Sequence, residues 1–380
     1  MNKLRQIEEL GQSIWYDNIS RALITGGGLQ KLVEKGLLGV TSNPTIFDKA
    51  ISGSTDYDQQ LRETLAHTPA ASGAELIRVL MIRDIQMAAD ILLPAHTRTQ
   101  GRDGYVSIEV TPSKARDTEA TIREVRELWS LVNRKNIMIK IPATKEGLPA
   151  IEQAIAEGFN VNVTLIFSVE RYREVAAAYI RGLERRAADN KPAGTVASVA
   201  SVFVSRVDTL VDEILQKKIE SASNPDAAAR LKGLLGKAAV ANAKMVYQAF
   251  KETFGTPAFA ALAARGARVQ RPLWASTGRK NPAYSDLLYV DTLIGPQTVN
   301  TVPPATLDAI IERSMPALTV ESDLAGARET LRGLFTAGVV MPSVMEKLEA
   351  DGVAAFEKSF DGLYENLEAK KSRLLERSPV

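Results

Sequence analysis

The sequence predicts an α/β protein, a (β/α)₈ (TIM) barrel with additional helices, on three observations. Eight short strand-like runs alternate with longer stretches that have helical periodicity. Strands joined by helical crossovers pair in parallel, and eight such units close into a barrel. The 380 residues suffice for one barrel with extra helices. We therefore expect residues 1–380 to form a single barrel domain.

The predicted strands are short apolar runs, each bounded by polar or turn-forming residues. They are Ser13–Ile19, Gly39–Asn43, Tyr105–Val110, Asn136–Pro142, Asn160–Phe167, Ala197–Val204, Pro272–Thr277 and Thr298–Pro303.

Amphipathic helices are predicted between most of these strands. After the third strand, Ile122, Val125 and Trp129 recur at the spacing of one helix face. After the fifth strand, Ser168 is placed as an N-cap for a similar pattern that begins at Tyr172. These crossovers support the parallel sheet.

Two regions exceed the minimal barrel. Residues 48–99 predict an insertion of two or more helices between the second and third strands. Residues 341–378 predict a charged helical extension after the eighth strand. This extension is either a solvated amphipathic tail or a helix that closes over the barrel mouth.

The composition excludes several kinds of site. The net charge of +2 does not favour a dedicated nucleic-acid binder. Cysteine is absent, so the chain has no disulfide and no thiol nucleophile, which fits a reducing compartment. The two histidines, His67 and His96, have no partners at metal-ligand spacing. We therefore expect no metal and no cofactor, and chemistry based on lysine, carboxylate, hydroxyl and arginine groups.

The first residues are charged and mixed, unlike a signal peptide, and no run of about 18 apolar residues predicts a membrane span. We expect a cytoplasmic protein. The glycines at 26–28 lack the spacing of a dinucleotide-binding fingerprint and predict a turn. The oligomeric state is not predicted by any of these patterns.

Strand periodicity places several polar residues inside the barrel. Lys140, Glu109, Asn162, Thr164 and Ser201 alternate with apolar residues that face the helices. Each lies near the carboxyl end of its strand, where barrel enzymes build their sites. Lys140 could simply form an ion pair with Glu109, but five converging polar groups favour a functional site.

A buried lysine suggests a particular chemistry. Burial among apolar side chains disfavours an ammonium ion, and a free amine can attack a carbonyl carbon to form an iminium ion. The iminium withdraws electrons from the adjacent C–C bond, which can then break without a metal or a cofactor. A carboxylate must carry the proton, and Asp17 and Glu109 are the candidates. Asp17 could alternatively cap a helix that starts near Ser20.

Four segments of the chain resemble the transaldolase family, in the family's strand order and from about residue 13 to residue 304. GVTSNPTIF (39–47) is similar to the first family signature, and IMIKIPATKEGLPAI (137–151) is similar to the second, which carries the Schiff-base lysine. NVNVTLIFS (160–168) and SVFVSRVD (201–208) match two further family segments.

The resemblance implies a role for each matching residue. Lys140 is implied to form the Schiff base, and Asp17 to be the general acid/base for the substrate C4 hydroxyl. Glu109 and Thr164 are implied to position the water of imine formation and hydrolysis. The remaining implied residues bind the dihydroxyacetone hydroxyls (Asn43 and Asn162, with Thr41 and Ser201) and the substrate phosphate (Arg206).

One segment departs from the family pattern. Many transaldolases have Ser-x-Arg after the seventh strand as part of the phosphate site. Here the stretch reads ASTGRKNP, so Ser276 matches, but the arginine is displaced to Arg279, beside Lys280. Either Arg279 binds phosphate from a longer loop or Ser276 acts with Arg206. The length and the 48–99 insertion indicate a longer transaldolase subfamily.

The resemblance implies reversible transfer of a dihydroxyacetone unit from sedoheptulose 7-phosphate to glyceraldehyde 3-phosphate, in the non-oxidative pentose phosphate pathway. The substrates would be sugar phosphates. A lyase of the fructose-6-phosphate aldolase type is the main alternative, but such relatives carry a tyrosine where this chain has Phe203. Free dihydroxyacetone formed from fructose 6-phosphate without an acceptor would indicate the lyase. A barrel without catalytic activity is a second alternative.

Overall fold

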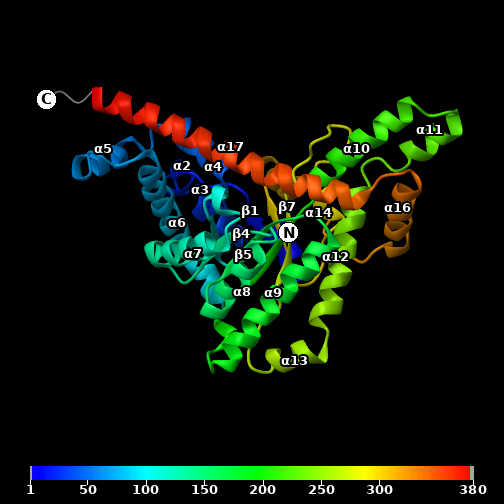
Figure 1. The fold of residues 1–380 in the computed structure, drawn as a ribbon, viewed down its shortest axis with the longest axis horizontal. Coiled ribbons are helices and arrows are strands. Elements are labelled where there is room, and N and C mark those ends of the chain that lie inside the picture. Colours follow the sequence, from blue (N-terminus) through cyan, green and yellow to red (C-terminus); the bar gives the residue numbers. More distant parts are fainter. Residues whose placement is uncertain (1, 377–380) are drawn as a thin grey trace.

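The structure, a computed structural model that describes residues 2–376, is a closed barrel of eight parallel strands in chain order (Figure 1). This confirms the predicted (β/α)₈ class. The strands are β1 (Gln12–Tyr16), β2 (Gly39–Thr41), β3 (Tyr105–Glu109), β4 (Ile137–Pro142), β5 (Val161–Ile166), β6 (Ser198–Phe203), β7 (Arg271–Ala275) and β8 (Thr298–Val302).

All eight predicted strands are present, and most end earlier than the pattern indicated. β1 stops at Tyr16, so Asp17 follows the strand rather than lying within it. β2 stops at Thr41 because Asn43 already caps the next helix. β7 stops at Ala275, and Ser276 adopts a left-handed backbone with φ of 54°. These ends place polar residues at the barrel mouth.

Strand β5 corrects one predicted side-chain direction. Its pairing with β6 shifts register between Val163 and Ile166, and Leu165 has a φ of 60°. A bulge of this kind re-aims the side chain. The alternation that places Asn162 and Thr164 inside the barrel predicts that Val163 and Leu165 face the outer helices. Instead Leu165 meets the C-terminal helix, where a Cβ atom on Gly352 would lie only 2.9 Å from Leu165 Cδ2.

Most of the helices surround the barrel, and the long C-terminal helix runs across one end of it (Figure 1). The helices are α1 (Lys3–Glu9), α2 (Arg21–Thr25), α3 (Gly28–Glu34), α4 (Pro44–Ser52), α5 (Asp58–His67), α6 (Gly73–Arg98), α7 (Thr118–Val132), α8 (Gly147–Glu157), α9 (Val169–Ala188), α10 (Ser205–Glu220), α11 (Pro225–Lys232), α12 (Ala238–Phe254), α13 (Pro257–Ala263), α14 (Leu288–Asp291), α15 (Pro304–Arg313), α16 (Leu324–Thr336) and α17 (Met341–Glu376), with 3₁₀ turns at Pro112–Lys114 and Ala193–Thr195.

The helices predicted after the third and fifth strands are confirmed as α7 and α9. Ser168 caps α9 as expected, since its hydroxyl accepts a hydrogen bond from the Arg171 amide at 3.0 Å. The glycines at 26–28 form the turn between α2 and α3, where Gly27 has a φ of 74°.

The 48–99 segment contains the end of α4, α5 and the long α6. A capping box starts α6, because Ser72 and Glu75 each accept a hydrogen bond from the other's backbone amide. A buried carboxylate joins this segment to α2. Asp84 accepts hydrogen bonds from Tyr57 at 2.8 Å and from Arg21 at 2.5 Å.

Helix α17 shows whether the C-terminal extension is a solvated tail or a cover for the barrel mouth. The last two residues predicted for it, 377 and 378, lie outside the described range. The helix crosses the barrel mouth (Figure 1), and its Phe356 lines the cavity there. Ion pairs fix both halves: Arg171 to Glu349 at 3.3 Å and Lys370 to Asp58 at 2.7 Å. The extension is therefore a cover for the mouth.

The opposite end of the barrel is filled by a buried ion pair. Asp103 is fully buried, and it accepts hydrogen bonds from Ser13, Trp15 and Arg271 at 2.9–3.1 Å. Burial alone raises the pKa of Asp103, but the Arg271 guanidinium and these hydrogen bonds outweigh it and lower the pKa below its ordinary value. This end of a barrel serves stability rather than chemistry.

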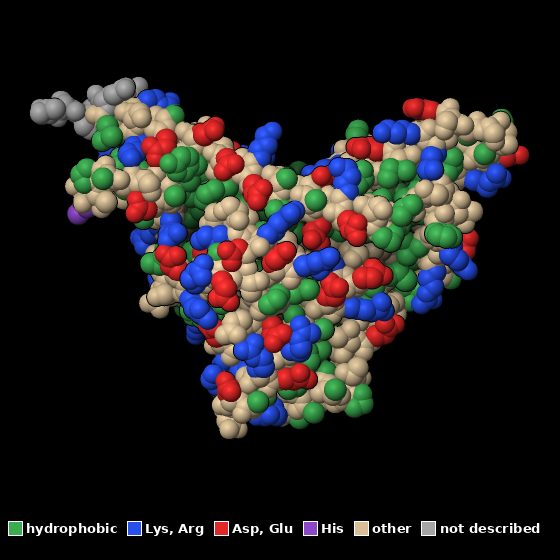
Figure 2. Space-filling model, in the orientation of Figure 1, with side chains coloured by type: hydrophobic (Ala, Val, Ile, Leu, Met, Phe, Trp, Pro, Cys, Tyr) green, Lys and Arg blue, Asp and Glu red, His purple; other side chains and the backbone are tan. Residues whose placement is uncertain are grey.

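The face of the molecule in Figure 2 carries lysine, arginine, aspartate and glutamate side chains intermixed, with no extended area of one charge. None of the helices in residues 2–376 is long and apolar enough to cross a membrane.

We predict that Arg271→Ala lowers the free energy of unfolding by about 3–5 kcal/mol, because it leaves Asp103 as an uncompensated buried charge. The matched control is Arg313→Ala, which removes an exposed ion pair with Asp286 and should cost only about 0–1 kcal/mol. Urea unfolding followed by circular dichroism measures both values. Equal losses in the two variants would contradict a structural role for the buried pair.

Candidate active site

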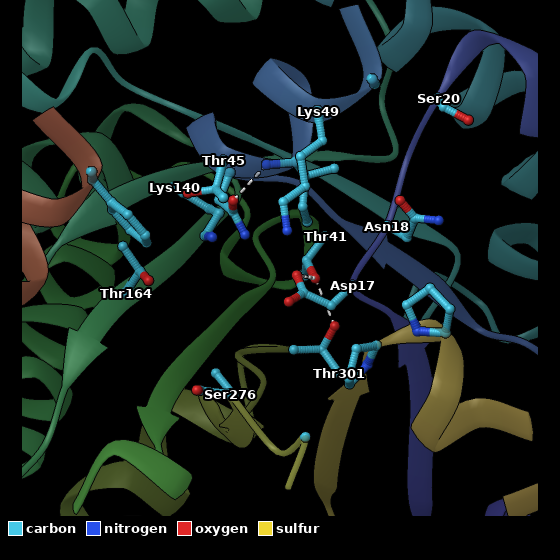
Figure 3. Close-up of a pocket in the computed structure, with 18 of the residues that line it drawn as sticks. Asp17, Asn18, Ser20, Thr41, Thr45, Lys49, Lys140, Thr164, Ser276 and Thr301 are labelled. Carbon is cyan, nitrogen blue, oxygen red and sulfur yellow. Dashed lines mark hydrogen bonds between the residues drawn. The ribbon is translucent and has the colours of Figure 1, made fainter. Parts of the chain in front are cut away.

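A cavity of about 640 Å³ opens at the carboxyl ends of the strands, and Phe356 of α17 is among its lining residues. Figure 3 shows many of the side chains that line this cavity. Strand ends and the first turns of the following helices supply its walls. Nine of the residues predicted for the site line it: Asp17, Thr41, Asn43, Lys140, Thr164, Ser201, Phe203, Arg206 and Ser276. The other three, Glu109, Asn162 and Arg279, are not among the lining residues.

Lys140 lies in β4, and its polar partners come from β3 and from the residue that follows β2. Its side chain is 6% exposed, and the Nζ atom donates a hydrogen bond to the Ser42 carbonyl at 3.0 Å. The Glu109 carboxylate from β3 is 3.4 Å away, across the register pair that aligns Glu109 with Lys140. The predicted ion pair therefore exists, and the same lysine also faces the cavity (Figure 3).

Glu109 and Thr164 have buried oxygen atoms whose hydrogen-bonding capacity is unused. Within residues 2–376, neither carboxylate oxygen of Glu109 nor the Thr164 hydroxyl makes a hydrogen bond, although all three are buried. Burial raises the pKa of Glu109, and the nearby Lys140 charge offsets part of this rise. Unsatisfied buried groups of this kind are costly in an inert core and are expected where a ligand or water binds.

Asp17 meets two threonines at the floor of the cavity (Figure 3). Thr41 donates to Asp17 Oδ1 at 2.7 Å, and the Thr41 and Thr301 hydroxyls are 2.6 Å apart. Since the single hydrogen of Thr41 is used by Asp17, Thr301 donates to Thr41. Burial raises the pKa of Asp17, while Lys140, Thr41 and Lys280 each counteract part of that rise.

The helix-cap interpretation of Asp17 is wrong. Ser20 caps α2 by accepting a hydrogen bond from the Leu23 amide at 3.2 Å, and Asp17 faces the cavity instead. Thr301 was missed by sequence reasoning. Its position near the carboxyl end of the eighth strand, in TVNTV, was the available signal.

The two asparagines lie at different depths. Asn162 is buried below the cavity, donating to Ser107 at 3.0 Å and accepting from Ser201 at 2.6 Å. Asn43 lines the cavity, and its Oδ1 accepts a hydrogen bond from the Ile46 amide as the cap of α4. The amide nitrogen of Asn43 is therefore the group it can offer to a ligand.

Cationic side chains surround the upper part of the cavity. Arg206 stands in the first turn of α10 with its guanidinium 5.6 Å from the centre of the Phe203 ring. Ser276 lies beside this helix start, its hydroxyl 3.0 Å from that of Ser205. Lys49 and Lys280 complete the lining. A helix N-terminus with converging cations suits an anion such as phosphate.

Arg279 is placed away from this anion site. Its guanidinium donates to the Pro282 and Tyr284 carbonyls at 3.3 and 3.1 Å within its own loop. The next residue, Lys280, reaches the cavity instead. Sequence reasoning noted Lys280 only as a neighbour, because the turn direction of this loop cannot be read from charge alone.

No cluster of three or more histidine, aspartate or glutamate side chains in the described part of the chain could hold a metal ion. His67 lies on the exposed face of α5, and His96 packs edge-on against Tyr105 at 5.1 Å between ring centres. Neither histidine lines the cavity.

Comparisons with known proteins agree with this geometry. The sequence matches the family described as Transaldolase/Fructose-6-phosphate aldolase over residues 14–367. It is 45% identical to a transaldolase of Trichodesmium erythraeum over 376 residues, or 98% of each chain. It is 46% identical to transaldolase 2 of a Nostoc species over the full length of both chains, and 47% identical to a transaldolase of Thermobifida fusca, covering 96% of this chain and 97% of that one.

We predict that Arg206→Ala weakens the binding of inorganic phosphate at least about ten-fold, since a charge-assisted hydrogen bond contributes roughly 1.5–3 kcal/mol. The nearby Arg279→Ala is the matched control. Because its guanidinium points into its own loop, phosphate affinity should change less than about two-fold. Calorimetric titration gives both values. Equal weakening in the two variants would place the anion elsewhere.

Proposed function

The chain belongs to the transaldolase/fructose-6-phosphate aldolase family and is a transaldolase, and we propose that Lys140 at the barrel mouth is its covalent nucleophile. The enzyme transfers a dihydroxyacetone unit reversibly from sedoheptulose 7-phosphate to glyceraldehyde 3-phosphate, giving erythrose 4-phosphate and fructose 6-phosphate. This reaction belongs to the non-oxidative pentose phosphate pathway. The observation that supports our assignment is the buried Lys140 Nζ, which faces the cavity 3.4 Å from Glu109.

The first step is attack of the Lys140 amine on the ketone carbon of the donor. The amine must be neutral to attack, and Glu109 is the nearest group that can take its proton. Glu109 then returns this proton to the hydroxyl of the resulting carbinolamine, the hydroxyl leaves as water, and an iminium ion remains. Glu109 and Thr164, whose buried oxygens make no hydrogen bond within residues 2–376, are positioned to hold that water.

Asp17 is the proposed base for bond cleavage. It removes the proton from the C4 hydroxyl, the C3–C4 bond breaks, and its electrons move toward the iminium nitrogen to form an enamine. The aldose leaves and an acceptor aldehyde takes its place. Thr41 and Thr301 hold the carboxylate at the cavity floor, so the base keeps one orientation through both half-reactions.

The substrate is proposed to lie along the cavity with its phosphate at α10. Arg206, Ser276 and Lys280 would bind the phosphate, and Asn43 and Ser201 would bind hydroxyls near the Schiff base. Asn162 supports Ser201 from below through its 2.6 Å hydrogen bond rather than by reaching the cavity itself. Arg279 would contribute only by holding the shape of the loop that carries Lys280.

The geometry around Phe203 favours transfer over the lyase alternative. The ring lines the cavity, packs against Phe167 at 5.4 Å between centres, and lies beneath the Arg206 guanidinium. A phenyl ring has no hydroxyl that could protonate the enamine or bring water to it. The enamine therefore persists until an acceptor aldehyde arrives.

We further propose that the enzyme works in the cytoplasm. The absence of cysteine from all 380 residues and the sugar-phosphate substrates support this location.

We predict that borohydride reduction in the presence of fructose 6-phosphate traps an adduct on Lys140. Lys140→Ala should abolish both adduct and transfer, whereas Asp17→Ala should still form the adduct but lose transfer by about 10²-fold or more. Peptide mapping by mass spectrometry locates the adduct. Lys49 is the internal control, because it is a second cavity lysine outside the barrel strands. An adduct on Lys49, or equal loss of adduct in both variants, would contradict this division of roles.

We predict that, as the pH falls, transfer activity is lost at a higher pH than it would be if the base were an aspartate with an ordinary pKa. The base must be ionised, and a raised pKa means that Asp17 becomes protonated earlier as the pH falls. Thr41→Val removes a hydrogen bond that lowers this pKa, so the acid limb of the kcat profile should move further up. Thr45→Val, which loses only its bond to Ser359, should leave the limb in place. A limb that Thr41→Val does not move would exclude Asp17 as its source.

A further inference from the structure

Lys280, in the loop after β7, lies on the border of two hollows. On one side it lines the cavity at the barrel mouth, together with Arg206 and Ser276. On the other side it lines a groove of about 810 Å³ between α10 and residues 280–284, here called the α10 groove. Lys280 is exposed, so its long side chain has room to turn toward either hollow. Only the first direction brings the ammonium group to the proposed phosphate site.

The α10 groove attracts a cation. Helix α10 contributes Asp212, Glu213 and Glu220 to its wall, and Lys217 is the one basic residue that this helix adds. An ammonium group is stabilised by Coulomb attraction to carboxylates that lie near it. A lysine on a loosely held loop would therefore turn toward the groove for part of the time. Phosphate binding at the barrel mouth requires a structure that prevents this.

A closed turn fixes the backbone next to Lys280. The Asn281 carbonyl accepts a hydrogen bond from the Tyr284 amide at 3.1 Å, and Asn281 Oδ1 accepts one from the Ala283 amide at 2.9 Å. These bonds close the turn without the Arg279 side chain, whose own bonds only add to it. Lys280 and Tyr284 therefore flank one compact unit, and holding one end of the unit restrains the other.

The Tyr284 side chain anchors this turn to α10. Its hydroxyl donates a hydrogen bond to Asp212 Oδ2 at 2.6 Å, and Asp212 Oδ1 accepts the Gly236 amide at 3.0 Å. Gly236 has a φ of 68°, and a Cβ atom there would lie 2.6 Å from the Tyr284 ring, so the ring packs closely on the glycine. Burial raises the pKa of Tyr284, as does its bond to Asp212, so the hydroxyl remains a donor.

Helix α10 carries both the anchor and the arginine of the anion site. Arg206 stands in the first turn of this helix, and Asp212 follows six residues later on the same helix. A rise of 1.5 Å per residue separates the two by about 9 Å along the helix axis. Because the helix is rigid, the bond from Tyr284 to Asp212 sets where the turn with Lys280 lies relative to Arg206.

We propose that Tyr284 and Asp212 are positioning residues for phosphate binding: they hold the turn on α10 so that Lys280 faces the cavity at the barrel mouth and not the α10 groove. The inference rests on the proposed function, in which Arg206, Ser276 and Lys280 bind the substrate phosphate. Neither Tyr284 nor Asp212 lines that cavity, so both act through Lys280 and not by touching the substrate.

The first test measures the affinity of the full chain for inorganic phosphate by calorimetric titration. Tyr284→Phe removes only the anchoring hydroxyl. The matched control is Tyr179→Phe, which removes a hydroxyl that donates to the Arg268 carbonyl at 2.7 Å and does not line either hollow. We expect Tyr284→Phe to weaken phosphate binding by about three-fold or more, and Tyr179→Phe to leave it within about 1.5-fold, since charge-assisted bonds dominate phosphate binding. Equal affinities in the two variants would overturn the inference.

The second test asks whether the anchor acts through Lys280. Lys280→Ala should itself weaken phosphate binding, and adding Tyr284→Phe to it should then cause less than about a 1.5-fold further loss, because coupled residues are not additive. A further loss as large as in the unmodified chain would show that the tyrosine acts by another route and would overturn the inference. Should Tyr284→Phe fail to fold, Asp212→Ala removes the same anchor from α10 and should give the same pattern.

The third measurement separates this inference from the proposed function. Dihydroxyacetone is a ketone without phosphate, so its borohydride-trapped adduct on Lys140 should form equally in Tyr284→Phe and the unmodified chain. With fructose 6-phosphate at saturating acceptor, Tyr284→Phe should raise KM by about three-fold or more and leave kcat nearly unchanged. Loss of the dihydroxyacetone adduct in Tyr284→Phe would mean a general disturbance of the mouth and would overturn the positioning role. Absence of any adduct on Lys140 in the unmodified chain would instead overturn the proposed function.

Discussion

The buried contact between Lys140 and Glu109 is the constraint around which the barrel mouth is organised. An ammonium group and a carboxylate 3.4 Å apart, both nearly without solvent exposure, are tolerated only if their remaining hydrogen-bonding capacity is satisfied. Lys140 finds one partner in the Ser42 carbonyl, but both Glu109 oxygens lack a hydrogen bond within residues 2–376. The Glu109 carboxylate therefore keeps free hydrogen-bonding capacity beside Lys140. It can use this capacity to exchange a proton with the lysine or with a bound ligand.

Other residues at the barrel mouth fix the groups around this pair and cover it from solvent. Thr41, itself bonded to Thr301, holds Asp17 in the cavity, so the proposed general base is fixed independently of the proposed Schiff-base lysine. Helix α17 closes the opening from above and is held by ion pairs in both halves, with Gly352 allowing close contact to Leu165. Structural ion pairs such as Asp103–Arg271 lie at the opposite end, where they do not compete with the chemistry.

The barrel and the polar residues of its strands could be predicted from the sequence, because successive side chains in a strand point to opposite faces. Lys140, Thr164 and Ser201 were assigned to the lumen on that basis, and all three line the cavity. The family resemblance, and not this alternation, implied Thr41, Asn43, Arg206 and Ser276. The alternation failed where the backbone leaves regular geometry. Leu165 turns toward α17 through the bulge in β5, and the loop after Ser276 turns Lys280 rather than Arg279 into the cavity. Leu165 and Ser276 have a left-handed backbone, and because neither is a glycine, the local sequence does not predict this conformation.

Strand and helix periodicity also could not predict the site residues that come from elements distant in the sequence. Phe356 reaches the cavity only because α17, which starts some 200 residues after Lys140, folds back across the mouth. The same helix is held by ion pairs in both of its halves, Arg171 to Glu349 and Lys370 to Asp58. A cover fixed on both sides of the mouth limits the access of bulk water to the cavity. An enamine that water must not protonate before the acceptor arrives depends on such a cover.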